Sequence, residues 1–477
     1  MIFYKNLIMQ IKSFFLQEIP LPAFSKRAFL FALLMVLLPN LAFLGLAWLS
    51  DTARPLINLD YLIAALLLVL PWRPLKWLGV AAFLVAALFD GLMFVMQLFP
   101  FMDLNGAIYL APFLFNAPLL YRLLAGGFLL YALLMPWLLI KIGRQTDIAH
   151  VAGLAAVLAV AAYFSGHLQY YERATRSLLF GNQNFYYGNS QLRLYMANQN
   201  MAFLQAAQTQ PVFSSLNFPR AVQHLNPTGS NKILLVVNES WGEPQNPALQ
   251  KAVLQGLLAQ PAFENVQHDS FLFVGATVEG EMRELCNASV KGFALKLAPP
   301  QQFTDCLPMQ YRQQGYETVA MHGASSQMYD RFSWYPKAGF QQALFGEQFL
   351  GKPRCEAFNG VCDSALFDEV GKAFSANDKL FFYWLTLTTH STYPEKDLFN
   401  RRLKCEDYGL PADTMMCRNF SLQAQFFDGL AELLKQPEMS GTEVLVVGDH
   451  SPPVVNLGET FKYMKQGEVA WVHFKVR

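Results

Sequence analysis

The chain has 477 residues, of which 53% are hydrophobic and only 15% are charged, so a single ordinary soluble domain is excluded. Its net charge is +1, and no basic run is interleaved with aromatic residues, which argues against a nucleic-acid partner. Part of the chain is therefore expected to lie in a lipid bilayer.

Five apolar segments before residue 166 are predicted to span a membrane. A bilayer core requires about 20 apolar residues in a helix, and soluble helices rarely stay apolar on all sides for that length. A set of buried helices in a large soluble core is disfavoured for this reason. The predicted spans are Ala28–Leu49, Pro55–Trp72, Trp77–Phe99, Leu120–Ile140 and His150–Ser165.

Basic residues around the spans predict their orientation. They precede the first span and follow the second and the fourth: Lys5, Lys12, Lys26, Arg27, Arg73, Lys76, Lys141 and Arg144. By the positive-inside rule the N-terminus is cytoplasmic and everything after the fifth span lies outside. No cleavable signal is apparent, so the first span serves as signal and anchor. The spans contain few charges, among them Asp60 and Asp90, which disfavours a transporter and leaves Asp90 without a role.

The cysteines all fall in the part predicted to lie outside. An even number in an oxidising compartment predicts disulfides, although six cysteines allow fifteen pairings. A zinc site built from thiols is disfavoured because no two Cys-x-x-Cys motifs lie close together. Pairing in sequence order closes the shortest loops and predicts Cys286 with Cys306, Cys355 with Cys362, and Cys405 with Cys417.

The chain beyond the spans changes character twice, which predicts three domains: 1–165, 166–230 and 231–477. The polar, aromatic middle segment is predicted to form interfacial helices and a connector, and a plain linker is equally compatible. In the last domain, apolar runs alternate with helical stretches, which predicts an α/β domain with a mostly parallel sheet. The predicted strands are Lys232–Val237, Phe271–Val274, Glu317–Ala320, Leu380–Leu387, Glu443–Val447 and Val469–Val476.

Polar side chains follow five of these strands directly. Open α/β sheets bind ligands at the carboxyl ends of their strands. One such residue alone is better explained as a helix N-cap or a buried polar group, but five together favour a functional site. The segments are Asn238-Glu239-Ser240, Gly275-Ala276-Thr277, Met321-His322-Gly323, Thr388-Thr389-His390 and Gly448-Asp449-His450.

Three of these segments supply a metal-ligand set. Glu239, Asp449 and His450 offer two carboxylates and an imidazole, which suit one divalent metal, Zn²⁺ or alternatively Mn²⁺. Thr277 is predicted as fourth ligand and nucleophile, because a cation lowers the pKa of its hydroxyl. It precedes the helix-like run Val278–Leu285, whose N-terminal amides would favour a bound phosphate. Helix capping by Thr277 is the alternative, and the two roles are compatible.

Three further residues are candidates for contacts with a phosphate. His390 and His322 can bind phosphate oxygens or protonate a departing alcohol, and each is alternatively a hydrogen-bonded core histidine. Arg331 offers a planar fork that suits a phosphate or an anionic headgroup, and its alternative is a surface ion pair.

The motifs in residues 231–477 resemble the sulfatase-like branch of the alkaline phosphatase superfamily. With five spans in front, the chain is similar to lipoteichoic acid synthases and to the phosphoethanolamine transferases of Gram-negative inner membranes, both of which use a threonine nucleophile. The runs Thr277–Glu281 and Tyr329–Arg331 look more like the synthases. The six cysteines look more like the transferases.

The resemblance implies an alkaline-phosphatase-like α/β/α sandwich in the periplasm, anchored in a bacterial inner membrane. It implies that phosphoethanolamine from phosphatidylethanolamine is carried on Thr277 to an envelope glycolipid or glycan, such as lipid A or its core sugars. It also implies substrate contacts by Tyr329 and by Asn105, in the loop between the third and fourth spans. A monomer is expected. The run Val278–Arg283 is not the Ser/Thr-rich run of the lipid A enzymes, which leaves the acceptor open.

Other activities remain as alternatives. Glycerol-phosphate transfer and a sulfatase-like phosphodiesterase would use the same nucleophile. A true sulfatase needs Cys-x-Pro-x-Arg, whereas the run Cys306–Gln310 lacks the arginine. A pseudoenzyme is disfavoured because Thr277 and Asp449 are both present.

Overall fold

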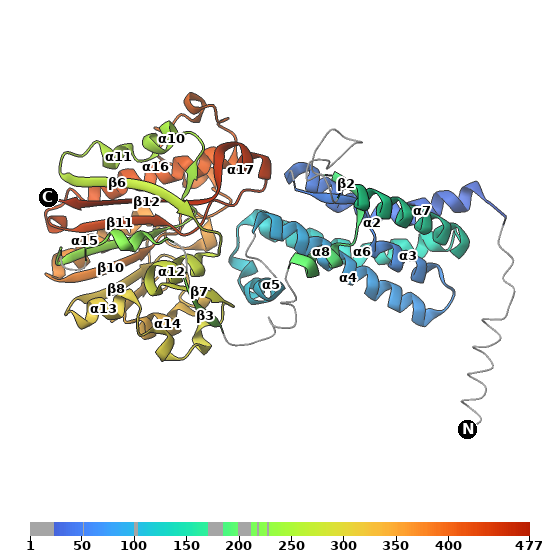
Figure 1. Ribbon diagram of the computed structural model, residues 1–477, viewed down its shortest axis with the longest axis horizontal. Helices are drawn as coiled ribbons and strands as arrows, with labels where there is room; N and C mark the ends of the chain where they lie inside the picture. Colours follow the sequence, from blue (N-terminus) through green and yellow to red (C-terminus); the bar gives the residue numbers. More distant parts are fainter. Residues whose placement is uncertain are drawn as a thin grey trace, which may run out of the picture. The chain divides into compact units, whose positions relative to one another are not determined.

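The computed structural model describes residues 23–50, 52–99, 104–169, 185–198, 211–216, 219–226 and 229–477. The chain forms two compact units (Figure 1). The helical unit comprises Met1–Gly45, Arg54–Asp90 and Leu130–Leu194. The sheet unit comprises Leu46–Ala53, Gly91–Leu129 and Tyr195–Arg477.

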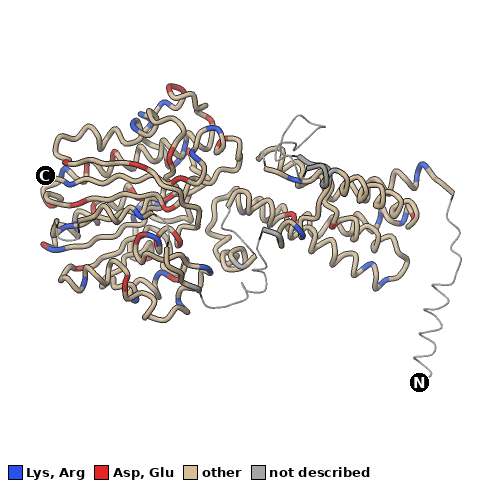
Figure 2. The backbone as a smooth tube through the Cα atoms, in the orientation of Figure 1, with Lys and Arg blue, Asp and Glu red and all other residues tan. Residues whose placement is uncertain are grey.

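Three helices in the described part of the chain are long and apolar enough to cross a membrane: α2 (Lys26–Ser50), α4 (Arg73–Leu98) and α6 (Leu119–Gly143). Figure 2 shows that Lys, Arg, Asp and Glu are sparse along them and frequent in the sheet unit. The three helices correspond to the predicted first, third and fourth spans, and their ends differ from the predicted ones by a few residues.

Five spans are not confirmed. In place of the predicted second span, the chain forms strand β1 (Arg54–Asn58) and the ten-residue helix α3 (Asp60–Val69). At 1.5 Å per residue, that helix covers about 15 Å, half of a bilayer core. In place of the fifth span lies α7 (Ile148–Gln169), whose apolar stretch, Ile148–Phe164, is shorter than those of the three long helices.

A buried polar cluster in the helical unit accounts for Asp90. Arg54 donates from Nε to Asp90 Oδ1 at 3.0 Å and from Nη2 to Asp90 Oδ2 at 2.6 Å. Asn58 and Gln191 also donate to this carboxylate, while Asn40 Oδ1 accepts from Arg54. β1 pairs in parallel with β2 (Phe185–Asn189), which leads into α8 (Gln191–Asn198). Arg54 therefore neutralises Asp90, and the amide side chains around the pair link the strand pair to the helices.

The sheet unit is built around an eight-stranded sheet in the order β5-β12-β11-β4-β10-β8-β9, with β6 also on β12. The run from β11 to β9 is parallel, whereas β12 is antiparallel to β11, and β5 and β6 are antiparallel to β12. The sheet is thus mixed rather than mostly parallel. The strands are β4 (Lys232–Asn238), β5 (Gly242–Pro244), β6 (Phe263–Leu272), β8 (Glu317–His322), β9 (Gln342–Phe345), β10 (Leu380–Leu385), β11 (Glu443–Gly448) and β12 (Met464–Val476).

Alternating strand residues face two apolar layers, so the domain is an α/β/α sandwich as predicted. Leu234 and Val236 pack into one core, and Ile233 and Leu235 into the other. Figure 1 shows helices on both faces of the sheet. The first core contains side chains of α10 (Pro247–Val253), α11 (Gln255–Leu258), α15 (Phe367–Ala376) and α16 (Met415–Leu433); the second contains those of α12 (Thr277–Cys286), α13 (Leu307–Gln313) and α14 (Arg331–Ala338).

The remaining elements are short. Strand β3 (Val212–Ser215) pairs with β7 (Ala288–Lys291), and helices α5 (Leu104–Leu110) and α17 (Leu457–Tyr463) complete the sheet unit. Much of the predicted connector 166–230, namely 170–184 and 199–210, lies outside the described residues.

All six cysteines form disulfides, paired in sequence order as the loop lengths predict. The bond between Cys286 and Cys306 ties the end of α12 to the start of α13.

Candidate active site

Two parallel neighbouring strands bring the predicted metal ligands together. Gly448 of β11 lies opposite Asn238 of β4, so the residues that follow each strand emerge side by side. Ligand atoms of Glu239, Asp449 and His450 all lie within 4.8 Å of one another. His450 Nε2 is 3.6 Å from Glu239 Oε1 and 3.3 Å from Asp449 Oδ2. All three side chains are buried.

The electrostatics of this cluster favour a bound cation. Burial, and then the charge of Glu239, raise the pKa of Asp449 to about 7. Burial alone would lower the pKa of His450, but the two carboxylates raise it. Asp449 Oδ1 accepts from the Ser240 and His450 amides at 2.7 Å, whereas its buried Oδ2 has no hydrogen-bond partner in the described part of the chain. The donor set and this orphaned oxygen fit a divalent metal.

Thr277 is the first residue of α12, and its hydroxyl points at this cluster. Its Oγ1 donates to Glu239 Oε2 at 3.4 Å. The helix N-cap is Ala276, and Glu279 accepts from the Ala276 amide at 2.7 Å, so Thr277 is not the capping residue. β6 runs in the same direction as β11, because both are antiparallel to β12. Although β6 pairs only with the antiparallel strand β12, it therefore ends at the same edge of the sheet as β4 and β11 and places Thr277 at that edge.

Arg331 is held by a buried carboxylate. Its Nε and Nη2 donate to Glu281 Oε2 at 2.9 and 2.8 Å, and both side chains are at most 1% exposed. The hydroxyls of Tyr335 and Tyr383 donate to Glu281 Oε1. The charge of Glu281 raises the pKa of Arg331 although burial opposes it. This arrangement favours the ion-pair alternative for Arg331, in the core rather than at the surface.

The two candidate histidines have different surroundings. His322 Nδ1 lies 3.0 Å from the Leu385 carbonyl, and burial together with the charge of Arg331 keeps its pKa well below the usual value. His390 Nδ1 lies 2.6 Å from the Ser391 carbonyl, and burial lowers its pKa to about 4. His390 is therefore a neutral hydrogen-bonding group near pH 7, and His322 is a core histidine.

Tyr329 is a buried residue with left-handed backbone, φ 56°. Its ring stacks on Tyr109, with centroids 6.1 Å apart and planes 9° apart. Asn105 belongs to α5, but its side chain lies outside the described residues. Tyr121, at the start of α6, donates its hydroxyl to Ser391 Oγ at 2.7 Å. Tyr121 could not be singled out beforehand, because an aromatic residue at the start of a span is ordinarily an interfacial anchor.

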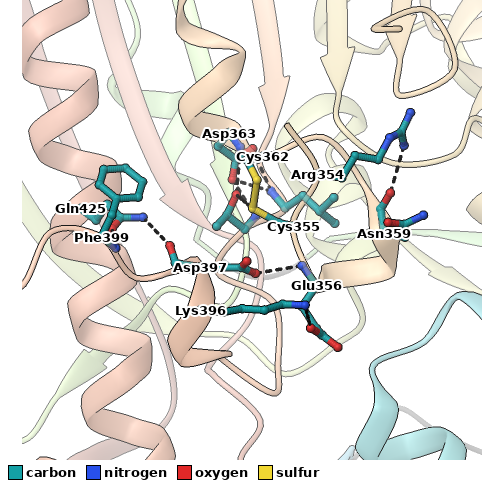
Figure 3. Close-up of a disulfide and its surroundings, with 12 residues drawn as sticks. Arg354, Cys355, Glu356, Asn359, Cys362, Asp363, Lys396, Asp397, Phe399 and Gln425 are labelled. Carbon is teal, nitrogen blue, oxygen red and sulfur yellow. Dashed lines mark hydrogen bonds and ion pairs between the residues drawn. A yellow bond between two sulfur atoms is a disulfide. The ribbon is translucent and has the colours of Figure 1, made fainter. Parts of the chain in front are cut away.

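A disulfide loop supports the segment that carries His390 (Figure 3). Asp363 directly follows Cys362 and accepts from the Leu387 and Thr388 amides at distances of 2.7–3.1 Å. The disulfide between Cys355 and Cys362 closes the preceding loop. Asp363 was not predicted as part of the site, and its position after a cysteine was the only signal.

A second layer of contacts holds the same loop. Asp397 Oδ2 accepts from the Glu356 amide at 2.9 Å, and its carbonyl accepts from Gln425 Nε2 at 3.0 Å (Figure 3). Lys396 forms an ion pair with Glu356. The disulfide loop, held by these contacts, therefore stabilises the turn from Leu387 to His390 through Asp363.

The fold and the strand-end cluster together define a domain of the sulfatase and alkaline phosphatase superfamily. The family profile described as Sulfatase matches residues 233–476, slightly more than half of the chain, and the protein belongs to this family. Cys306 is bonded to Cys286, so it is not the modified cysteine of a true sulfatase. Comparison with curated proteins finds no match.

Solved structures with similar folds share little sequence with the chain. The lipoteichoic acid synthase LtaP from Listeria monocytogenes is 16% identical, with a TM-score of 0.39, covering 52% of this chain and 66% of that one. The periplasmic domain of EcEptC from Escherichia coli is 17% identical, with a TM-score of 0.32, covering 55% and 76%. The lipooligosaccharide phosphoethanolamine transferase EptA from Neisseria meningitidis, an integral membrane protein, is 13% identical, with a TM-score of 0.49, covering 95% and 89%. The chain thus spans just under two thirds of the length of LtaP.

Proposed function

We propose that the protein is a metal-dependent phosphotransferase that carries a phospho group covalently on Thr277. The observation that carries the proposal is the position of the Thr277 hydroxyl, 3.4 Å from Glu239 Oε2 in the buried ligand cluster. In the same cluster, Asp449 Oδ2 has no hydrogen-bond partner in the described part of the chain. Glu239, Asp449 and His450, with Thr277 as the fourth ligand, would hold the cation. When bound, Zn²⁺ or alternatively Mn²⁺ supplies Lewis acidity, which favours the deprotonated threonine and offsets phosphate charge.

The residues of the chain support two successive displacements at phosphorus. In the first, Thr277 Oγ1 bonds to phosphorus as the bond to the donor alcohol breaks, and the threonine proton ends on the oxygen of the departing diacylglycerol. In the second, the acceptor oxygen bonds to phosphorus as the bond to Oγ1 breaks, and the proton of the acceptor hydroxyl returns to Oγ1. The N-terminal amides of α12 favour the phosphate charge. His390 is neutral because burial lowers its pKa to about 4, and its one N–H is given to the Ser391 carbonyl, so its Nε2 accepts a hydrogen bond, such as that of an acceptor hydroxyl.

The proposed donor is phosphatidylethanolamine, and the proposed acceptor is a glycolipid or glycan of the bacterial envelope. Three disulfides support an oxidising compartment such as the periplasm, and three apolar helices support a membrane anchor that would keep the released diacylglycerol in the bilayer. We propose the domain order 1–165, 166–230 and 231–477, a cytoplasmic N-terminus and a monomeric enzyme. Glycerol-phosphate transfer is the second candidate, because Thr277–Glu281 and Tyr329–Arg331 look like the lipoteichoic acid synthases.

Intact-protein mass spectrometry tests this proposal. Purified protein and its Thr277→Ala variant are incubated with Mn²⁺ or Zn²⁺ and phosphatidylethanolamine, and in parallel with phosphatidylglycerol. A phosphoethanolamine adduct on the wild type and none on the variant is expected. A glycerol-phosphate adduct would identify the second candidate. Absence of any adduct in a protein that binds metal would contradict the transferase proposal.

A further inference from the structure

Arg283 joins the nucleophile helix to the segment that carries two metal ligands. It lies in α12, six residues after Thr277, and is fully buried. Its Nη2 donates to the Gly448 carbonyl at 2.6 Å and its Nη1 to the Asp449 carbonyl at 3.2 Å. These carbonyls belong to the end of β11, directly before His450. One guanidinium therefore fixes two consecutive peptide groups of the ligand segment.

The guanidinium is itself held from three sides. Its Nε donates to Glu284 at 2.6 Å, and the guanidinium carbon lies 4.2 Å from the ring centroid of Phe273. Glu284 in turn accepts from the Val222 amide at 2.9 Å and from the Ala221 amide at 3.4 Å. Since every partner of Arg283 is in the core, the residue is not available to substrate. Its orientation is locked, and so are the carbonyls that it bonds.

Gly280 brings the same helix into direct backbone contact with Asp449. A Cβ atom at Gly280 would lie 2.7 Å from the Asp449 carbonyl oxygen and 2.9 Å from its Cα. Side chains do not tolerate that distance to backbone atoms, so only glycine permits this approach. Gly280 and Arg283 are three residues apart and therefore share one face of α12.

We propose that Arg283 is a positioning residue that, together with the close approach at Gly280, sets the spacing between Thr277 and the ligands Asp449 and His450. This inference rests on the proposed function. The reason for an arginine is geometric, because the planar fork bonds two adjacent carbonyls and one carboxylate at once, whereas an ammonium group cannot hold that arrangement. Partners behind first ligands typically change metal affinity 10- to 100-fold.

The test compares two arginines that have the same kinds of hydrogen-bond acceptors. Arg402 also bonds two consecutive carbonyls, those of Ala252 and Val253, and one carboxylate, that of Asp428, but it is partly exposed and none of these partners belongs to a ligand segment. Full-length wild type, Arg283→Lys and Arg402→Lys are treated with chelator in detergent and titrated with Mn²⁺ by calorimetry, and their melting temperatures are recorded. We expect both variants to melt earlier, and only Arg283→Lys to bind Mn²⁺ about tenfold more weakly.

Equal Mn²⁺ affinity in wild type and both variants would overturn the positioning role while leaving the proposed function intact. A wild type that binds no divalent metal would instead contradict the proposed function itself. If Arg283→Lys does not fold, Gly280→Ala serves in its place, with Gly371→Ala in α15 as its control, because the nearest atoms to a Cβ at Gly371 are side-chain ends of Gln436, Glu438 and Leu433. Weakened metal binding in Gly280→Ala alone supports the inference, and equal binding in both glycine variants overturns it.

Discussion

Two clusters of this protein bury carboxylates, and they differ in whether their charges are satisfied. In the helical unit, Asp90 has Arg54 at 2.6 Å and further donors from Asn58 and Gln191. In the sheet unit, Glu239 and Asp449 approach each other with the His450 imidazole between them, and Asp449 Oδ2 has no hydrogen bond in the described part of the chain. A satisfied cluster specifies structure, whereas an unsatisfied one has a place for a cation.

The largest expected effect is the loss of turnover when the proposed nucleophile is removed. Thr277→Ala removes the attacking oxygen, so turnover should fall about a thousandfold or more, as it does when other enzymes lose their nucleophile. Release of diacylglycerol from phosphatidylethanolamine measures this. Thr277→Ser keeps a hydroxyl and should retain measurable turnover. Equal activity in Thr277→Ala and wild type would remove Thr277 from the mechanism.

Neutralising one aspartate in each cluster should change stability in opposite directions. Asp90→Asn leaves Arg54 buried without a counter-charge and should lower the unfolding free energy by about 3 kcal/mol. Asp449→Asn removes a buried charge and its repulsion with Glu239, which together raise the pKa of Asp449, and should stabilise the metal-free protein. Thermal unfolding in detergent after chelation gives both values. Destabilisation of similar size in both variants would contradict the difference that we infer between the two clusters.

Asp363 should make stability depend on acidity. Burial raises the pKa of Asp363 to about 6, well above the ordinary value of an aspartate. The folded state therefore binds this proton more tightly, so the stabilisation is present below about pH 4 and is lost as pH rises through 6, up to about 3 kcal/mol. Asp363→Asn resembles the protonated form and does not titrate, so its stability should stay constant over that range while that of wild type falls. The exposed Asp407→Asn is the control and should follow wild type at every pH.

Metal removal should destabilise the sheet unit. A ligand at one hundred times its dissociation constant adds about 2.7 kcal/mol to the folded state. Adding Mn²⁺ or Zn²⁺ to chelated wild type should therefore raise the melting temperature, and the gain should disappear in His450→Ala. The Arg54 cluster provides the comparison, because Asp90→Asn should keep the full metal-dependent gain.

The strand-end pattern brought the candidate ligands together because residues that follow strands of one direction emerge at one edge of the sheet. Glu239 follows the buried strand β4, Asp449 and His450 follow the buried strand β11, and Thr277 follows the more exposed β6, which runs in the same direction. The antiparallel pairing of β12 was not predicted, since a continuous apolar run does not reveal which neighbour it faces.

Other features depend on tertiary contacts that leave little trace in sequence. Arg331 looked like a phosphate ligand until the fold placed Glu281 beside it. The contacts of Arg283 with the Gly448 and Asp449 carbonyls join segments 165 and 166 residues apart. Hydropathy indicated five spans because β1 and α3 together are as apolar as a span, although the chain changes from strand to helix at Leu59.

Metal titration of the full-length protein tests the central claim most directly. Chelated wild type and Glu239→Gln are titrated with Mn²⁺ by calorimetry, since Glu239 is the ligand that also accepts the Thr277 hydroxyl. We expect one ion per chain in wild type and binding at least tenfold weaker in the variant. A wild type that binds no ion, or a variant that binds equally well, would contradict it.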